Sequence, residues 1–208
     1  SSYSVTGVQT CALPICTRTE DPVVHFYETF LAEYDPKLRQ SRGVYYTPEP
    51  VVQFIVRSVD EILKTRFGKA WGLAEDSVKI LDPACGTGTF LYFVIQQIHE
   101  EVVQQRRQAG QWNSKARALL DRLFGFELLM APYVVSHLKL GLLMKELGAP
   151  LAGSERLNIF LTNTLEEGVT RAETLAGLGS YIAEESSDAA AVKKQDDIMV
   201  VLGNPPYS

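Results

Sequence analysis

Residues 78–88 read VKILDPACGTG, a short apolar run followed by an acidic residue and a glycine turn. Apolar residues then recur at helical spacing from about Thr89 to Ile98, so the stretch predicts a strand, a tight turn and a helix. Gly86 and Gly88 carry no Cβ, which allows the backbone of the turn to approach a ligand closely. The pattern therefore indicates one strand-turn-helix unit of an α/β fold, with a ligand site at the turn.

Three more apolar runs indicate strands at 123–127, 158–161 and 198–202, and a helix is expected from Pro132. Strands that alternate with helices predict an α/β fold in which right-handed crossovers join a parallel sheet. Ligands of such sheets bind beyond the carboxyl ends of the strands. The polar residues at these four ends are expected to share one site: Asp82, Glu127, Asn163 and Asn204.

Two helices are expected before the sheet. The first follows Asp21 and Pro22, and we interpret its apolar stripe as core packing: Val23, Phe26, Tyr27, Phe30, Leu31 and Tyr34. The second has Thr47 as its cap and Pro48 as its first residue. Its predicted buried face comprises Val51, Val52, Ile55, Val59, Ile62 and Leu63. Residues 166–197, by contrast, are polar and alanine-rich and indicate only a weak helix.

The composition is that of an ordinary globular protein, because 46% of the 208 residues are hydrophobic and 22% are charged. The formal net charge of -5 counts against an independent nucleic-acid-binding module, which usually has a basic face. No apolar run reaches the roughly 18 residues that a membrane span needs, so we expect no membrane partner. The three cysteines lack metal-like spacing, so we expect neither a metal site nor a disulfide framework.

The two ends of the chain have unusual sequences. Residues 5–15, VTGVQTCALPI, resemble the translation of a sequencing-adapter oligonucleotide, so residues 1–16 are interpreted as an artefact. Residues 17–70 are assigned to an N-terminal helical segment, and residues 71–208 to the domain that carries the sheet and the site. Because the chain stops at Ser208, directly after a strand and a turn, we expect this domain to be incomplete at its C-terminus.

The glycine turn favours a positively charged ligand. A dinucleotide-binding turn would have a third glycine where this chain has Leu91, and the carboxylate of Asp82 would repel a pyrophosphate. S-adenosylmethionine has an ammonium, a sulfonium and no phosphate, so we predict that it is the cofactor. Its methionine end is assigned to Asp82, Pro83, Ala84, Cys85, Gly86 and Gly88. The alternative is a tight turn in which Asp82 only caps the following helix.

Glu127 and Asn163 are the candidates for the remainder of this cofactor. A carboxylate at the end of the second strand can accept hydrogen bonds from both hydroxyls of a ribose, and Glu127 is assigned this role. Asn163 could hydrogen-bond the adenine edge. Simpler interpretations stay open, namely a solvated surface charge for Glu127 and an ordinary turn residue for Asn163.

The tetrapeptide Asn204-Pro205-Pro206-Tyr207 is predicted to be catalytic. Its two prolines fix the backbone, so the Asn204 carboxamide and the Pro205 carbonyl can present two acceptors in the same direction. Two acceptors that bond both hydrogens of an aromatic amine favour its pyramidal form and stabilise the positive charge that develops on methyl transfer. Tyr207 could stack on a base that has left the double helix. A simple Asn-Pro turn is the alternative.

These motifs resemble those of the adenine-specific DNA methyltransferases. Residues 82–88 resemble the cofactor loop of that family, and residues 204–207 its catalytic tetrapeptide. Residues 44–48, VYYTP, are similar to a further cofactor motif, which implies that Thr47 and Pro48 line the methionine pocket with Tyr46 nearby. The resemblance implies a Rossmann-like class I methyltransferase fold. It also implies a prokaryotic, cytoplasmic enzyme that methylates the exocyclic amino group of an adenine flipped out of double-stranded DNA.

Residues 21–48 and 161–166 narrow the resemblance to the methylase part of type ISP restriction-modification enzymes, although many relatives have aspartate in place of Asn163. Most DNA contacts are expected outside this chain. Three other functions stay open. The same tetrapeptide serves methylation of RNA bases and of protein glutamine. A dinucleotide-dependent oxidoreductase would need the missing third glycine, and the chain could also be a folded cofactor-binding piece without activity.

Overall fold

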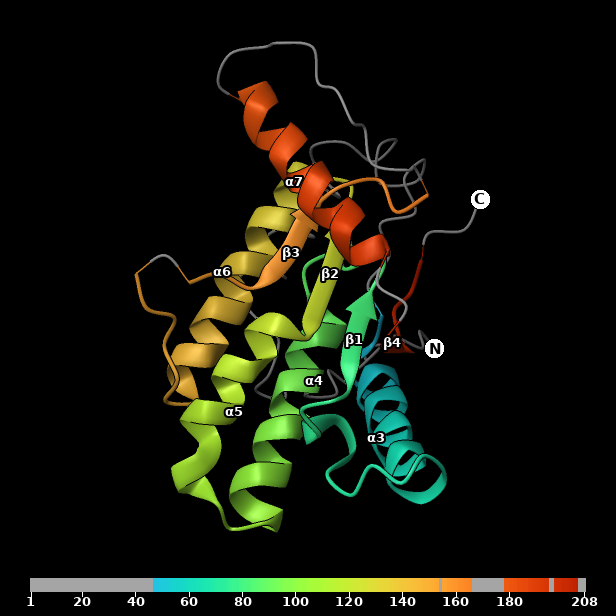
Figure 1. Ribbon diagram of the computed structural model, residues 1–208, viewed down its shortest axis with the longest axis vertical. Coiled ribbons are helices and arrows are strands. Elements are labelled where there is room, and N and C mark those ends of the chain that lie inside the picture. Colours follow the sequence, from blue (N-terminus) through green and yellow to red (C-terminus); the bar gives the residue numbers. More distant parts are fainter. Residues whose placement is uncertain (1–46, 154, 166–177, 195–196, 206–208) are drawn as a thin grey trace, which may run out of the picture.

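The computed structural model describes residues 47–153, 155–165, 178–194 and 197–205, and within these ranges four strands form one sheet (Figure 1). The strands are β1 (Lys79–Asp82), β2 (Leu123–Glu127), β3 (Asn158–Leu161) and β4 (Ile198–Val201). Their order is β3-β2-β1-β4 and every neighbouring pair is parallel. The predicted α/β fold is confirmed, and each strand lies within one residue of its predicted bounds.

Helices connect the strands in the alternating order that the sequence predicts. They are α3 (Glu49–Arg66) before β1, α4 (Thr89–His99) and α5 (Trp112–Ala118) between β1 and β2, α6 (Met130–Glu146) between β2 and β3, and α7 (Leu178–Lys193) before β4. A π-helical segment, Glu100–Gln105, continues α4, and short 3-10 turns occupy Gly72–Ala74, Ala109–Gln111 and Leu119–Asp121. None of the helices in the described ranges is long and apolar enough to cross a membrane.

The helices pack on both faces of the sheet. On one face, α3, α4 and α6 enclose the larger hydrophobic core together with inward side chains of the strands, among them Ile80, Leu123 and Ile159. On the other face, α7 lies across β2 and β3 (Figure 1). There it buries Ala189 and Val192 against three phenylalanines of the strands, Phe124, Phe126 and Phe160. The sheet is therefore covered from both sides, as parallel sheets require.

The start of α3 differs from the prediction. The helix begins at Glu49 with Pro48 at the N-cap position, and no side chain of the described residues caps it. The predicted capping role of Thr47 is therefore wrong, because its hydroxyl accepts a hydrogen bond from Asn204 at 3.0 Å instead.

The buried face of α3 also differs in part from the predicted one. On α3, Val51 and Ile62 are 46% and 47% exposed, whereas Val56 and Asp60 are buried. The reason is that α3 packs along α4 through a single row of side chains rather than through a broad stripe. On α6, Val134, Leu138 and Leu142 are about half exposed. This helix buries Tyr133, Ser136, Lys139, Leu140 and Leu143.

Candidate functional site

The turn after β1 is held against the end of β2. Asp82 pairs with Gly125 in the register of the two strands, and beyond them the Cys85 N–H donates to the Phe126 carbonyl at 2.8 Å. The Thr162 N–H donates in turn to the Glu127 carbonyl at 2.8 Å. The carboxyl ends of β1, β2 and β3 therefore meet at one edge of the sheet, as the sequence predicts.

The two glycines of the turn have different roles. Both have a positive φ, +57° at Gly86 and +80° at Gly88, which side chains other than glycine rarely adopt. A Cβ at Gly88 would lie 3.2 Å from the Ser136 Cβ and 3.3 Å from Leu140, so Gly88 allows the turn to pack against α6. A Cβ at Gly86 would meet no atom of the described residues within 4 Å, so this backbone is open in the part of the chain that the structure describes. Gly86 is thus the position where a ligand can approach.

Glu127 shapes the turn with both carboxylate oxygens. Its Oε2 accepts a 2.8 Å hydrogen bond from the Gly86 N–H, and its Oε1 accepts a 2.7 Å hydrogen bond from the Leu129 N–H. Burial raises the pKa of Glu127, and these backbone donors partly counteract that effect. Glu127 is therefore more than a solvated surface charge, and each oxygen still has a lone pair that a ligand hydroxyl could use.

Asp82 is a buried carboxylate with one unused oxygen. Its Oδ1 accepts a 3.0 Å hydrogen bond from the Ala84 N–H, whereas its Oδ2 has no partner among the described residues. Burial, with a smaller contribution from the nearby Glu127 carboxylate, raises the pKa of Asp82 to about 7. No side chain caps α4, so the interpretation of Asp82 as a helix cap is wrong. A buried anion without a counter-charge is unfavourable, and a cationic ligand would relieve this cost.

The other residues of the turn contribute mainly backbone. The Cys85 side chain is buried, and a Cβ at Gly125 would lie 3.0 Å from its sulfur, so the thiol fills the space beside β2. Burial raises the pKa of this thiol well above its usual range. The Pro83 carbonyl accepts a hydrogen bond from the Thr164 hydroxyl, which fixes the turn to the segment after β3.

Asn163 forms a local turn in the structure. Its Oδ1 accepts a 3.1 Å hydrogen bond from the Leu165 N–H, and its backbone carbonyl accepts a 2.6 Å hydrogen bond from Lys193 of α7. These contacts agree with the interpretation of Asn163 as a turn residue. Its assignment to the adenine edge of a cofactor stays a prediction.

The segment after β4 contacts the turn after β1. The Leu202 N–H donates to the Leu81 carbonyl at 3.0 Å, which continues the pairing of β4 with β1. A Cβ at Gly203 would lie 2.5 Å from the Asp82 Oδ1, so only glycine allows this close approach. Asn204 follows at once and is exposed. The role of Gly203 could not be predicted, because it depends on Asp82, a residue far away in the chain.

Asn204 also meets the start of α3. Its Nδ2 donates a 3.0 Å hydrogen bond to the hydroxyl oxygen of Thr47, while Pro48 and Pro205 are exposed nearby in sequence. The structure thus brings together residues from the three predicted motifs at 46–48, 82–88 and 204–207. Tyr46, Pro206 and Tyr207 lie outside the described residues.

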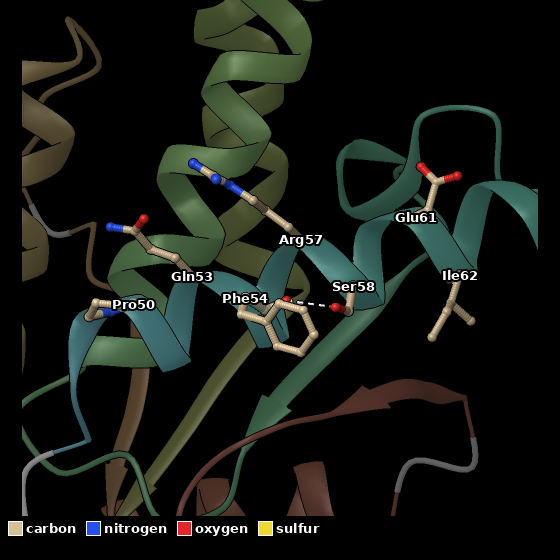
Figure 2. Close-up of a pocket in the computed structure, with 7 residues that line it drawn as sticks. All are labelled: Pro50, Gln53, Phe54, Arg57, Ser58, Glu61 and Ile62. Atoms are coloured by element: carbon tan, nitrogen blue, oxygen red, sulfur yellow. Dashed lines mark hydrogen bonds between the residues drawn. The ribbon is translucent and has the colours of Figure 1, made fainter.

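Two further features lie apart from these strand ends. A shallow groove of about 630 Å³ runs along the outer face of α3 from Pro50 to Ile62 and contains none of the predicted site residues (Figure 2). Its most exposed apolar side chain is Phe54, at 71%. In the part of the chain that the structure describes, no group of three or more His, Cys, Asp or Glu residues is arranged to hold a metal ion.

Comparison with known families identifies the chain. The family described as N-6 DNA Methylase matches residues 18–208. The chain belongs to this family. The match covers all three motifs, which agrees with the resemblance inferred from them.

Solved structures of restriction-modification enzymes share the methylase fold of this chain. A DrdV–DNA complex solved by cryo-electron microscopy is 28% identical, with a TM-score of 0.68 over 89% of this chain. A nuclease-deletion mutant of the type ISP enzyme LlaGI, in complex with a DNA substrate mimic, is 26% identical, with a TM-score of 0.66 over 89%. The ATP-dependent type ISP enzyme LlaBIII, bound to DNA, is 28% identical, with a TM-score of 0.63 over 88%.

These similarities confirm a Rossmann-like methyltransferase fold and the resemblance to type ISP enzymes. The methylase chain spans only 16%, 14% and 12% of the lengths of the three proteins, respectively. No curated protein sequence matches the chain.

Proposed function

We propose that this chain is the methyl-transfer part of an enzyme that methylates the exocyclic amino group of adenine in DNA, with S-adenosylmethionine as the donor. The observation that carries the proposal is the contact between the two motifs. The close approach of Gly203 to Asp82 sets the start of the Asn204 tetrapeptide directly against the cofactor turn. A methyl donor bound at the turn would therefore lie beside the residues proposed to bind the acceptor amine.

The residues at the turn fit a cationic cofactor. Within the described residues, Asp82 offers a buried carboxylate with an unused oxygen, and the Gly86 backbone is open to a ligand. In this proposal Asp82 binds the ammonium of the methionine end and Glu127 accepts hydrogen bonds from the ribose hydroxyls. S-adenosylmethionine supplies a methyl group on a sulfonium, which makes the methyl electrophilic and leaves a neutral thioether.

Asn204 and Pro205 activate the acceptor. The amine of adenine is a weak nucleophile because its lone pair is delocalised into the ring. The Asn204 carboxamide oxygen and the Pro205 carbonyl oxygen each accept a hydrogen bond from one N–H of the amine. These two bonds favour the pyramidal amine and stabilise its growing positive charge. As the new nitrogen–carbon bond forms, the amine loses one proton to solvent. Holding donor and acceptor in line supplies most of the remaining acceleration.

DNA is the proposed substrate because the chain belongs to the N-6 DNA Methylase family and the three similar structures are DNA complexes. The adenine would have to leave the duplex, since its amino group is not accessible to the site while the base is stacked. The acidic net charge of the chain, -5, implies that other parts of the intact protein supply most contacts with the phosphate backbone. The proposal also implies that the enzyme acts in a prokaryotic cytoplasm.

The proposal is tested with the Asn204→Ala variant of the intact protein that contains this chain. We expect transfer of tritiated methyl to unmethylated plasmid DNA to fall by about two orders of magnitude or more, as on loss of one transition-state hydrogen bond. Cofactor affinity should stay within about threefold, since Asn204 binds the acceptor. Asn113→Ala, in an exposed position of α5, is the matched control and should behave as the wild type.

The same assay identifies the substrate. Wild-type protein is offered DNA, RNA and protein in parallel, and the labelled product is digested to nucleosides or amino acids. Label in N6-methyladenine from DNA supports the proposal. Label only in RNA or in glutamine, or an unchanged rate for Asn204→Ala, contradicts it. Tight binding of NAD without binding of S-adenosylmethionine would instead indicate an oxidoreductase.

A further inference from the structure

Thr47 and Asn204 contact each other although 157 positions separate them in the sequence. The Asn204 Nδ2 donates a 3.0 Å hydrogen bond to the Thr47 hydroxyl oxygen. Thr47 is half-buried, and Asn204 is exposed. One end of the Asn204 carboxamide is therefore held, while the side chain remains accessible to a ligand.

The Thr47 hydroxyl is not used by its own helix. Threonine before a helix commonly caps the free backbone N–H groups of the first turn. Among the described residues no side chain caps α3, and the proline at position 48 takes the N-cap position. The hydroxyl therefore serves Asn204 rather than α3.

A carboxamide has one donor end and one acceptor end, and a half-turn of the side chain exchanges them. The proposed methyl transfer needs the acceptor end, Oδ1, to face the adenine amine. With Nδ2 bonded to Thr47, Oδ1 is directed to the other side. We propose that Thr47 is a positioning residue that holds the Asn204 carboxamide in its reactive orientation, an inference that rests on the proposed function.

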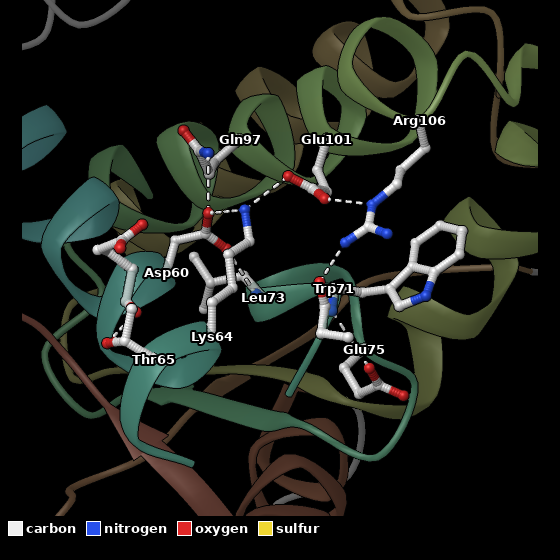
Figure 3. A network of polar contacts seen from close by, with 11 residues as sticks. Asp60, Lys64, Thr65, Trp71, Leu73, Glu75, Gln97, Glu101 and Arg106 are labelled. Atoms are coloured by element: carbon white, nitrogen blue, oxygen red, sulfur yellow. Dashed lines mark hydrogen bonds and ion pairs between the residues drawn. The ribbon is translucent and has the colours of Figure 1, made fainter. Parts of the chain in front are cut away.

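The helix α3, which begins two residues after Thr47, is anchored by buried polar contacts (Figure 3). Asp60 of α3 accepts hydrogen bonds from the Leu73 N–H at 2.8 Å and from the Gln97 Nε2 of α4 at 3.2 Å. Lys64 lies 2.8 Å from Asp60 and 2.6 Å from the buried Glu101, which extends the network along α4. These contacts fix α3 to the helix that follows the cofactor turn.

Asn204 is anchored from the sheet side. The Leu202 N–H continues the ladder with β1, and Gly203 packs against Asp82. Both partners of the hydrogen bond thus adjoin anchored segments, Thr47 the start of α3 and Asn204 the Gly203 contact, so the orientation of Asn204 is set before a substrate binds. Such preorganisation lowers the cost of reaching the transition state.

This role differs from the one that the sequence motif predicts for Thr47, a contact with the methionine end of the cofactor. A residue that only binds the cofactor changes its dissociation constant and leaves the rate at saturating cofactor unchanged. A residue that positions Asn204 lowers that rate and leaves cofactor affinity unchanged. The two roles are therefore separable in one set of measurements.

The test compares Thr47→Val, which removes the hydroxyl at nearly constant volume, with Thr47→Ser, which keeps it. In the intact protein, we expect Thr47→Val to lower kcat on unmethylated plasmid DNA by about ten- to a hundredfold. S-adenosylmethionine affinity should change by less than about twofold. Thr47→Ser should recover most of kcat. Thr65→Val, which removes a hydroxyl bonded to the Glu61 carbonyl on the same helix, is the control and should leave kcat unchanged.

A loss of cofactor affinity at unchanged kcat would overturn the proposal, as would equal rates for the valine and serine variants. A second measurement does not depend on activity. In protein labelled with ¹⁵N-asparagine, the Asn204 side-chain amide signal, assigned with Asn204→Asp, should shift in Thr47→Val and return in Thr47→Ser.

An amide signal that is unchanged in Thr47→Val also overturns the proposal. If wild-type protein transfers no methyl to DNA, the proposed function fails, and the amide signal still decides whether Thr47 holds Asn204.

Discussion

The backbone N–H of Gly86 donates a 2.8 Å hydrogen bond to the Oε2 of Glu127, which lies 41 positions later in the chain. The second carboxylate oxygen accepts from the N–H of Leu129, the residue that precedes α6. One side chain thus ties the cofactor turn after β1 to the start of α6. Because Glu127 is also proposed to bind the ribose, the shape of the turn and the binding of the ligand depend on the same group.

Glu127→Gln should damage both functions. Glutamine has a single acceptor oxygen. Its NH₂ group would therefore face one of the two backbone N–H groups that donate hydrogen bonds to the carboxylate. We expect the free energy of unfolding to fall by about 1–3 kcal/mol, the cost of a buried unsatisfied donor. Cofactor affinity should fall by about tenfold or more, as on loss of about 1.4 kcal/mol of binding energy. Urea unfolding and titration calorimetry measure the two effects.

Glu146→Gln, at the exposed end of α6, is the control and should change neither quantity. Wild-type cofactor affinity in Glu127→Gln would show that the carboxylate does not contact the ligand.

Gly86→Ala should separate ligand binding from stability. An alanine at φ +57° is strained by roughly 1 kcal/mol, and its Cβ would project into the open space where we propose that the cofactor binds. Gly148→Ala, at φ +80° just after α6, introduces similar strain far from the strand ends and likewise meets no atom within 4 Å. We expect similar losses of stability in both variants, and loss of cofactor binding only in Gly86→Ala. Thermal unfolding with and without S-adenosylmethionine tests this pair.

The cofactor affinity should rise with pH between about 5.5 and 7.5. Burial raises the pKa of Asp82 from 3.8 to about 7. Between these two pH values the carboxyl group is protonated in the folded protein and ionised in the unfolded chain. The stability that this group contributes is therefore fully present below pH 3.8 and is lost as the pH rises through about 7. A bound ammonium favours the ionised carboxylate, so binding below pH 7 releases a proton. The amine of the ligand stays protonated in this window, because α-amino groups have a pKa of roughly 7.7–8.0.

Calorimetry in two buffers of different ionisation enthalpy measures the released proton. We expect the affinity for S-adenosylmethionine to increase by up to about tenfold per pH unit. Asp82→Asn should bind weakly and with a smaller slope. A residual slope in that variant is expected from Glu127, because burial raises the pKa of Glu127 in the same direction. Asp121→Asn, in an exposed position, should keep the wild-type slope. A wild-type affinity that is independent of pH would exclude Asp82 as the ammonium partner.

The strands and the positions of the site residues could be predicted because their signals are local. A run of four or five mostly apolar residues that ends in Asp82, Glu127 or an Asn-Pro turn can be recognised as a strand without knowing which strands lie beside it. The helix α7 gave only a weak signal, since its polar, alanine-rich sequence has little apolar periodicity; among its described side chains, the hydrophobic ones buried against the sheet are Ala189 and Val192. The buried face of α3 was partly mispredicted. This helix carries apolar residues on more than one side, and tertiary contacts decide which side packs.

The contacts within the site could not be predicted, because each joins residues that are distant in sequence. Gly203 and Asp82, Thr47 and Asn204, and Gly86 and Glu127 meet only when the sheet has formed. The burial of Asp60, by contrast, could have been predicted from the sequence. A charged residue in register with the apolar row of a helix indicates a buried polar contact that the fold must satisfy.

The network around Glu101 should contribute far more to stability than a surface ion pair does. Glu101 is 2% exposed and lies 2.6 Å from the Lys64 Nζ and 2.7 Å from the Arg106 Nε (Figure 3). Glu101→Gln removes the carboxylate charge that Lys64 and Arg106 share, although Lys64 keeps its contact with Asp60, and we expect the free energy of unfolding to fall by about 2–4 kcal/mol. This range lies below that for fully buried pairs, because Lys64 and Arg106 are partly exposed.

Asp76→Asn breaks an ion pair with Lys115 of similar length, 2.9 Å, in which the Asp76 side chain is 60% exposed. It should cost less than about 1 kcal/mol. Urea unfolding of the two variants at low and high salt makes the comparison. Salt should reduce the Asp76 effect and leave most of the Glu101 effect, since buried charges are screened weakly. Equal losses in the two variants would mean that the network does not anchor α3, and the preorganisation of Thr47 would then need another source.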